Sequence, residues 1–315
     1  MPTCVPRAIV QNYDKSSQIS RIFGCVAHSR FKLTMCITFL FTNPGGDCSI
    51  KYKLILINNR DEIYARSTQS ATLMTDGDDL QSIYSIDLAG AVKGTWLGIS
   101  SDGDVIRLGN LANVTGDDQI HGKRGRGPIV TNFIKCRDET IELQADKLVN
   151  QCQDYSSFNF LSVVINNDDI KTFYVSNTPK ISQKLPPGFY GLGNSPLSRP
   201  FKKVDEGIKQ FKEVLDAHAH STKEELLENL TNILKNKEKF MPDLELTSRR
   251  KETAEHFSSI HVVLPDEGYG TRTRTIILVD ETGNIDYVEE TMTSEDPDGK
   301  WATTHLKIPK LVSQL

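Results

Sequence analysis

The sequence lacks the patterns that mark membrane spans, metal centres and nucleotide sites. No run approaches the roughly 20 consecutive apolar residues of a membrane-spanning helix, so a transmembrane protein is not expected. The six cysteines and seven histidines are scattered without the short Cys/His spacings of a zinc site, and no metal site is predicted. No GxGxxG fingerprint follows a strand, which argues against a nucleotide-cradling loop. Free thiols in a reducing compartment are the simplest interpretation, and this predicts a soluble intracellular protein.

The sequence also lacks a large excess of charge of one sign. The formal net charge of −4 gives no overall attraction to nucleic acid or to anionic membranes, and no nucleic-acid partner is expected. The hydrophobic share of 38% and the charged share of 25% are those of an ordinary globular protein. A chain of 315 residues can bury a large core without disulfide or metal staples.

The first 34 residues differ in composition from the rest. They contain no Glu and carry five basic residues against Asp14 alone, a local charge of +4. Such a basic, serine-rich segment is typical of a mitochondrial transit peptide. A poorly ordered tail, or sequence upstream of a start at Met35, is the alternative. We therefore predict a basic N-terminal extension over residues 1–34 and a single domain over residues 35–315.

Short apolar runs and helical stripes predict an α+β protein. Strands are predicted over residues 36–41, 53–57, 95–100, 105–108, 160–165, 172–175, 259–264, 275–280 and 285–289. Helices are predicted over residues 129–136, 139–151, 204–217 and 223–235, the last opened by a capping box of Ser221 and Glu224. The polar segment 236–255 is predicted to be a surface loop. Strands in clusters and helices in pairs favour mostly antiparallel sheets over a regular βαβ alternation.

Cys36 begins the first predicted strand and is the first candidate for chemistry. If translation starts at Met35, or if the upstream segment is removed, Cys36 becomes terminal and carries a thiol and an α-amino group together. An α-amine with a pKa near ~8 can act as the general base for its own side chain. The alternative is a buried structural cysteine.

The second predicted strand ends in a run of strongly polar residues. These are Asn58, Asn59, Arg60, Asp61 and Glu62, and a polar end to an apolar strand is typical of a site edge. Arg60 beside a terminal thiol would lower the pKa of that thiol, and Asp61 could orient the amine or a water molecule. The alternative is a charged turn.

Polar residues in glycine-rich settings form a third group of candidates. Glycine permits close approach of the backbone to a ligand, and asparagine amides can hold an oxyanion. A basic loop, Arg124-Gly125-Arg126-Gly127, leads into a predicted helix and could bind a phosphate or carboxylate. Ordinary turns with incidental polar residues are the alternative. The ligand-binding candidates chosen from these segments and from the polar strand end are Asn59, Glu62, Trp96, Asn110, Arg124 and Arg126.

Seven short segments of the sequence occur in an order that resembles the transport and Golgi organization protein 2 family, the NRDE-motif proteins. The pieces are Met35-Cys36-Ile37, Asn59-Arg60-Asp61-Glu62, the run from Gly94 to Ser100, Arg124-Gly125-Arg126-Gly127, Phe158-Asn159, the run from Pro187 to Leu192 with Asn194, and the run from Gly268 to Thr273. Each piece alone is weak, but the ordered set is specific.

The resemblance implies a four-layer αββα sandwich like that of N-terminal-nucleophile hydrolases. It implies Cys36 as the nucleophile, Arg60 and Asp61 as its neighbours, Asn194 as an oxyanion donor and Arg272 as a substrate clamp. As the sequence is written, Cys36 is preceded by residues 1–35, so its amine is not free. Similarity of this kind supports a fold better than a reaction.

Two functional hypotheses follow from the resemblance. One is a protein of Golgi organisation and secretory transport that handles haem or an acyl-lipid (acyl-CoA) ligand, in the cytoplasm, in mitochondria or at the Golgi. Haem would then be cargo rather than a resident cofactor. The other is an enzyme, a cysteine amidohydrolase or thioesterase that uses Cys36.

Overall fold

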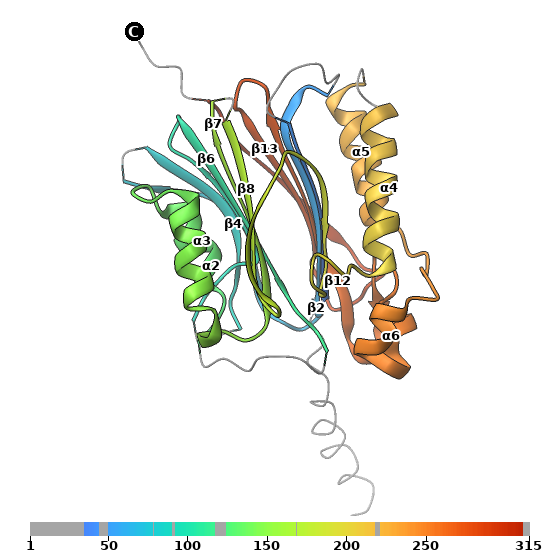
Figure 1. Cartoon of the computed structure of the whole chain (residues 1–315). Helices are drawn as coiled ribbons and strands as arrows, with labels where there is room; N and C mark the ends of the chain where they lie inside the picture. The colour runs from blue at the N-terminus through green and yellow to red at the C-terminus, as the bar shows by residue number, and fades with distance from the viewer. Residues whose placement is uncertain are drawn as a thin grey trace, which may run out of the picture. The chain divides into compact units, whose positions relative to one another are not determined.

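The computed structural model describes residues 35–43, 50–77, 79–89, 92–116, 124–167, 169–217 and 221–310. The predicted extension, residues 1–34, lies outside the described residues. The described residues form two antiparallel sheets that face each other, with helices on both outer faces (Figure 1). No helix in this part of the chain has the length and apolar character needed to cross a membrane.

The first sheet carries the two strands that begin the described chain. Its spatial order is β10 (Gly188–Leu192), β1 (Met35–Thr42), β2 (Tyr52–Ile63), β12 (Tyr269–Asp280), β13 (Ile285–Met292) and β14 (Trp301–Ile308), with β11 (Val263–Leu264) paired to β12. The β1–β2 hairpin pairs Cys36 with Arg60. A strand from the far end of the chain, β12, then pairs along β2 and brings Thr271 opposite Asp61.

The second sheet follows the order of the chain. It contains β3 (Thr68–Asp76), β4 (Leu80–Asp87), β5 (Leu97–Ser101), β6 (Val105–Asn113), β7 (Phe158–Asn166), β8 (Asp169–Asn177) and β9 (Lys180–Leu185). Consecutive strands pair with each other, so this sheet is a simple antiparallel meander.

Two groups of helices form the outer layers. On the second sheet, α2 (Pro128–Lys135) packs on β5 and β6, and α3 (Ile141–Asn150) packs on β8 (Figure 1). On the first sheet, α4 (Lys202–Ala217) packs on β1 and β10, and α5 (Lys223–Leu234) packs on β2 and β12. A shorter helix, α6 (Leu244–Arg250), and the 3₁₀ helix η2 (Lys251–Phe257) follow.

Side-chain alternation in β1 decides which layer each residue faces. Cys36 and Leu40 belong to the core between the sheets, and Thr38 donates a hydrogen bond across to Asn110 of β6 at 3.0 Å. Phe39 faces the other way and packs on Phe211 of α4, with ring centroids 6.2 Å apart. Cys36 therefore faces the space between the two sheets.

The predicted α+β class and the four-layer αββα sandwich of mostly antiparallel sheets are confirmed. The predicted surface loop over residues 236–255 is wrong, because this segment contains α6 and part of η2. Helix α6 buries only Leu246, so it leaves no apolar stripe in the sequence; the carboxylate of Asp243 caps it instead. The capping box of α5 lies one residue later than predicted, at Thr222 and Glu225.

Candidate functional site

A cavity of about 340 Å³ opens where the ends of β1 and β2 meet the second sheet and two loops. Six of the residues singled out in the sequence line it: Cys36, Arg60, Asp61, Glu62, Trp96 and Arg126. These residues come from segments spread over nearly a hundred residues of the sequence, and it is the fold that brings them together. Among the described residues, no group of three or more His, Cys, Asp or Glu side chains could hold a metal ion.

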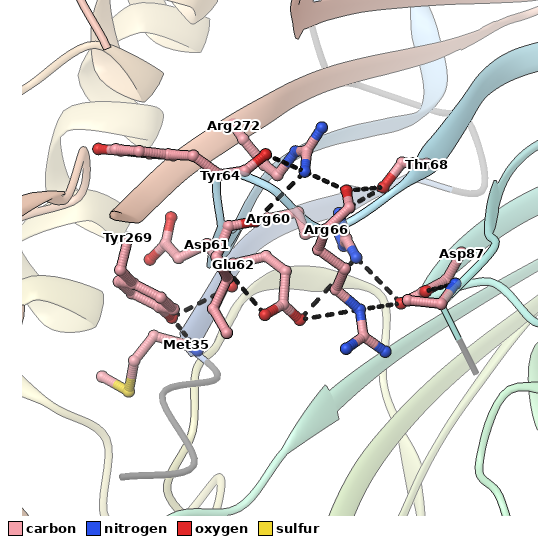
Figure 2. A network of polar contacts seen from close by, with 12 residues as sticks. Met35, Arg60, Asp61, Glu62, Tyr64, Arg66, Thr68, Asp87, Tyr269 and Arg272 are labelled. Carbon is pink, nitrogen blue, oxygen red and sulfur yellow. Dashed lines mark hydrogen bonds and ion pairs between the residues drawn. The ribbon is translucent and has the colours of Figure 1, made fainter. Parts of the chain in front are cut away.

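Cys36 is fixed in this cavity by its backbone. Its nitrogen donates a hydrogen bond to Oδ1 of Asn194 at 2.7 Å, and Nδ2 of Asn194 donates to the carbonyl of Asn113 at 2.8 Å. One residue earlier, the nitrogen of Met35 donates to the hydroxyl of Tyr269 at 2.8 Å (Figure 2). The backbone nitrogens of Met35 and Cys36 thus both donate to side chains, although the two residues pair with β2.

The thiol of Cys36 is held in its protonated form. Burial raises its pKa to about 12, with a further increase from the charge of Asp61, and the opposing effect of Arg60 is smaller. The reactive form of a cysteine is the thiolate. A thiol held in this form requires a neighbouring base to take up its proton before it can act as a nucleophile.

Strand alternation divides the four residues of the NRDE motif into two pairs. Arg60 and Glu62 project toward the second sheet, where Arg60 contacts Asp87 and Trp96. Asn59 projects toward the helices, because its Nδ2 donates to the carbonyls of Leu234 and Ile260 at 2.9 Å each. The carboxylate of Asp61 is on that side too, so only half of the motif directs its side chains to the space between the sheets.

The charges that face the second sheet form a chain of ion pairs (Figure 2). The guanidinium of Arg60 lies 3.0 Å from Asp87 and 4.3 Å from the centre of the Trp96 ring. Arg66 lies 2.8 Å from the same Asp87 oxygen and 3.5 Å from Glu62. Burial tends to raise the pKa of Asp87, but the two arginines bring it below its ordinary value. Two cations and two carboxylates thus balance each other.

Asp61 belongs to a second, more deeply buried group. One carboxylate oxygen accepts a hydrogen bond from Thr271 at 2.6 Å, and the other has no hydrogen-bond partner in the described structure. Burial raises the pKa of Asp61 to about 7, and the nearby charge of Lys203 opposes that increase. Lys203 of α4 is itself fully buried, donates to the carbonyl of Ser259 at 3.1 Å, and has a pKa lowered by burial.

A crossing of two glycine-containing loops places Arg126 beside the thiol. Gly94 and Gly127 touch so closely that a Cβ atom on Gly94 would lie 2.1 Å from the Cα of Gly127. Thr95 donates a hydrogen bond to the carbonyl of Gly127 at 3.4 Å across this crossing. Because neither loop can carry a side chain there, the crossing fixes Trp96 and Arg126 on the same cavity wall.

The crossing predicts a stability difference between two glycine substitutions. Gly94→Ala is expected to lower the free energy of unfolding by about 1–3 kcal/mol, since the new methyl group must push two backbones apart. Gly125→Ala is the matched control in the same loop, because nothing lies within 4 Å of its added Cβ. Urea denaturation of both variants measures the difference. Equal stability would show that the two loops are not held in contact.

The remaining predicted residues lie elsewhere. Asn59 holds carbonyls of the helical layer, Asn110 accepts the Thr38 hydroxyl, and Arg124 pairs on the surface with Asp154 at 3.5 Å. Arg272 donates hydrogen bonds to the carbonyls of Ile63, Tyr64 and Arg66, and so clamps the turn after β2 (Figure 2). The structure does not bring these four to the Cys36 cavity.

Several residues of the site carry no sequence signal of their own. Asp87 and Arg66 complete the ion-pair chain, and Lys203, Thr271 and Tyr269 surround Asp61 and the Met35–Cys36 junction. Only Tyr269 and Thr271 lie in a segment that the sequence singled out. A lysine in an amphipathic helix, such as Lys203, is normally solvent-exposed.

Comparison with known proteins gives one family and several relatives. The family model "Transport and Golgi organisation 2" matches residues 35–294. Transport and Golgi organization protein 2 of Drosophila melanogaster is 37% identical over 283 residues, covering 87% of this chain and 98% of the relative. The Homo sapiens homolog is 31% identical over 266 residues, covering 83% and 95%. Among solved structures, Anbu from Hyphomicrobium sp. strain MC1 aligns with a TM-score of 0.34 at 10% identity, covering 80% of this chain and 84% of that one.

Proposed function

The chain belongs to the Transport and Golgi organisation 2 family, and from this premise we propose that it is a cysteine hydrolase of the N-terminal-nucleophile type. It would cleave an amide or a thioester with Cys36 once the peptide bond before Cys36 is broken. The names of its relatives further support a role in transport and Golgi organisation, within which this reaction would operate.

One observation carries the proposal: the nitrogen of Cys36 is held by a side chain beside its own thiol. Asn194 accepts the hydrogen bond from that nitrogen at 2.7 Å, and the thiol lies in the cavity. In the uncut chain this nitrogen belongs to an amide and can take up no proton. Removal of the preceding residue turns it into an α-amine with a pKa near ~8, which can accept the thiol proton.

The reaction would then proceed through an acyl-enzyme. The Cys36 sulfur attacks the carbonyl carbon while its proton moves to the α-amine. The C–N or C–S bond of the substrate breaks, and the leaving amine or thiol takes up that proton. Water, deprotonated by the same amine, hydrolyses the thioester and frees the acid. Oδ1 of Asn194 accepts the hydrogen bond from the Cys36 nitrogen, so we assign Asn194 to orienting the amine. Its Nδ2 has two N–H donors and uses one on the carbonyl of Asn113, so the oxyanion role implied by the resemblance stays a prediction.

Handling of haem or an acyl lipid as cargo stays a prediction. A haem pocket requires an apolar cleft with an axial ligand. The Cys36 cavity is instead lined by the charged residues Arg60, Glu62, Arg66, Asp87 and Arg126, which gives more support to chemistry on a small polar substrate. Residence in the cytoplasm, in mitochondria or at the Golgi also stays a prediction.

The test compares three forms of the protein. We expect a chain that begins at Cys36 to hydrolyse members of a panel of acyl anilides and acyl thioesters, and to show the acyl adduct on Cys36 by intact mass. We expect the full-length chain and a Cys36→Ala variant to show neither. Cys152→Ala is the control, since Cys152 is buried away from the cavity. Turnover that survives in Cys36→Ala would refute the proposal.

A further inference from the structure

Arg126 is the one cavity arginine that no described carboxylate neutralises. Arg60 and Arg66 share Asp87 and Glu62, whereas the hydrogen bond recorded for the guanidinium of Arg126 is a donation to the carbonyl of Ser157 at 2.6 Å. A guanidinium has five N–H donors. Burial lowers the pKa of Arg126 to about 10, so the group stays charged at neutral pH. Within the described part of the chain, a positive charge with most of its donors free therefore faces the cavity.

Trp96 adds a second donor without an acceptor on the same cavity. Its side chain is 7% exposed, and its Nε1 has no hydrogen-bond partner in the described structure. One face of the ring is covered by the guanidinium of Arg60. A buried N–H without an acceptor costs free energy unless a ligand supplies one.

We propose that the Cys36 cavity binds an anionic group of its ligand, a carboxylate or a phosphate, through the guanidinium of Arg126, with Nε1 of Trp96 as a second donor. The planar fork of a guanidinium matches the paired oxygens of such groups. The substrate of Cys36 would then be an acyl compound that carries a negative charge near the scissile bond. That last step rests on the proposed function, but the anion site itself does not.

The position of Arg126 supports this assignment over an incidental surface charge. The Gly94–Gly127 crossing fixes the backbone next to Arg126, and Arg126 and Cys36 line the same cavity. Arg124, two residues earlier, has a different environment: it is exposed, pairs with Asp154 and stacks on Tyr155. The two arginines of the loop thus separate into a surface residue and a cavity residue.

The test titrates the full-length chain with sodium phosphate or sodium acetate against sodium chloride at constant ionic strength. A Trp301→Phe background leaves Trp96 as the single tryptophan, so its fluorescence reports the cavity. We expect a saturable change with at least one anion, and an apparent affinity about 10- to 100-fold weaker in Arg126→Gln. The same anion should raise the unfolding temperature of the chain with both tryptophans, and Arg126→Gln should abolish that shift.

Arg124→Gln is the matched control and should keep both responses. A response to phosphate alone identifies a phosphate ligand, and a response to acetate alone identifies a carboxylate. No saturable response to either anion, or a response that Arg126→Gln leaves intact, overturns the inference. If the anion binds but the chain that begins at Cys36 shows no turnover, the anion site is retained and the hydrolase is refuted. If that chain shows turnover but no anion binds, the hydrolase is retained and the anion site is refuted.

Discussion

In a Lys203→Met variant, the free energy of unfolding is expected to fall above pH 7 by about 1.4 kcal/mol for each pH unit, relative to the wild type. The cause is Asp61, whose pKa burial raises to about 7 in the folded chain. Between the ordinary value of 3.8 and about 7, the folded state binds more protons than the unfolded state, so stability falls as the pH rises through this window. Above about pH 7, the Asp61 carboxylate of the wild type no longer changes the free energy of unfolding with pH.

Loss of Lys203 extends this pH range, over which stability falls, to higher pH. The charge of Lys203 lowers the pKa of Asp61, so its removal raises that pKa above about 7 and the fall in stability continues into the alkaline range. The depressed pKa of Lys203 itself makes the wild type more stable as the pH rises, which widens the difference.

Urea denaturation at pH 6, 7, 8 and 9 measures this slope. Lys202→Met is the matched control, because the neighbouring lysine is only partly buried and donates to the carbonyl of Met241. A double variant, Asp61→Asn with Lys203→Met, should lose this slope, since neither member of the buried pair remains to titrate. A Lys203→Met variant that keeps the wild-type pH profile would show that the two buried groups do not interact.

In the chain that begins at Cys36, Asn194→Ala is expected to lower kcat by about 10²–10⁴-fold. The amide of Asn194 bridges the Cys36 nitrogen and the carbonyl of Asn113. Its removal leaves the α-amine, which is the general base, without a fixed orientation, and it leaves both groups without hydrogen-bond partners. The unpaired groups should also lower the free energy of unfolding by about 1–3 kcal/mol. Kinetics on the folded fraction, with stability measured in parallel, separates the two effects.

Asn177→Ala supplies the comparison for that experiment. Asn177 is a buried asparagine that accepts from the nitrogen of Phe158 and donates to the carbonyls of Cys152 and Tyr155, away from the cavity. Its removal should cost similar stability and leave kcat unchanged. If Asn194→Ala retains full kcat, Asn194 is a structural residue and the orientation of the amine has another source.

The sequence was sufficient to place Cys36 beside Arg60. They lie on neighbouring strands of one hairpin, which two apolar runs separated by the turn-forming residues 43–47 predict locally. The association of Trp96 and Arg126 with the same site came only from order along the chain within a family pattern. The crossing of Gly94 and Gly127 provides its physical cause.

The remainder of the site depends on contacts between distant segments. A lysine at the start of a helix is normally solvent-exposed, and only the packing of α4 on the first sheet buries Lys203. Asp87 ends β4, a strand that the sequence analysis did not predict. Arg272 lies where the pairing of β12 with β2 shifts register, and its side chain binds the turn after β2. The alternation of residues within one strand cannot predict a shift of register between two strands.

The division of the NRDE motif between two faces limits how this segment can change length. A strand repeats every two residues, so inserting or deleting a single residue within β2 before Asn59 would exchange the two pairs. Asn59 and Asp61 would then turn toward the second sheet, and Arg60 and Glu62 would meet the carbonyls that Asn59 now binds. Length variation within this strand is therefore compatible with the site only in steps of two, although the turn before it is free of that constraint.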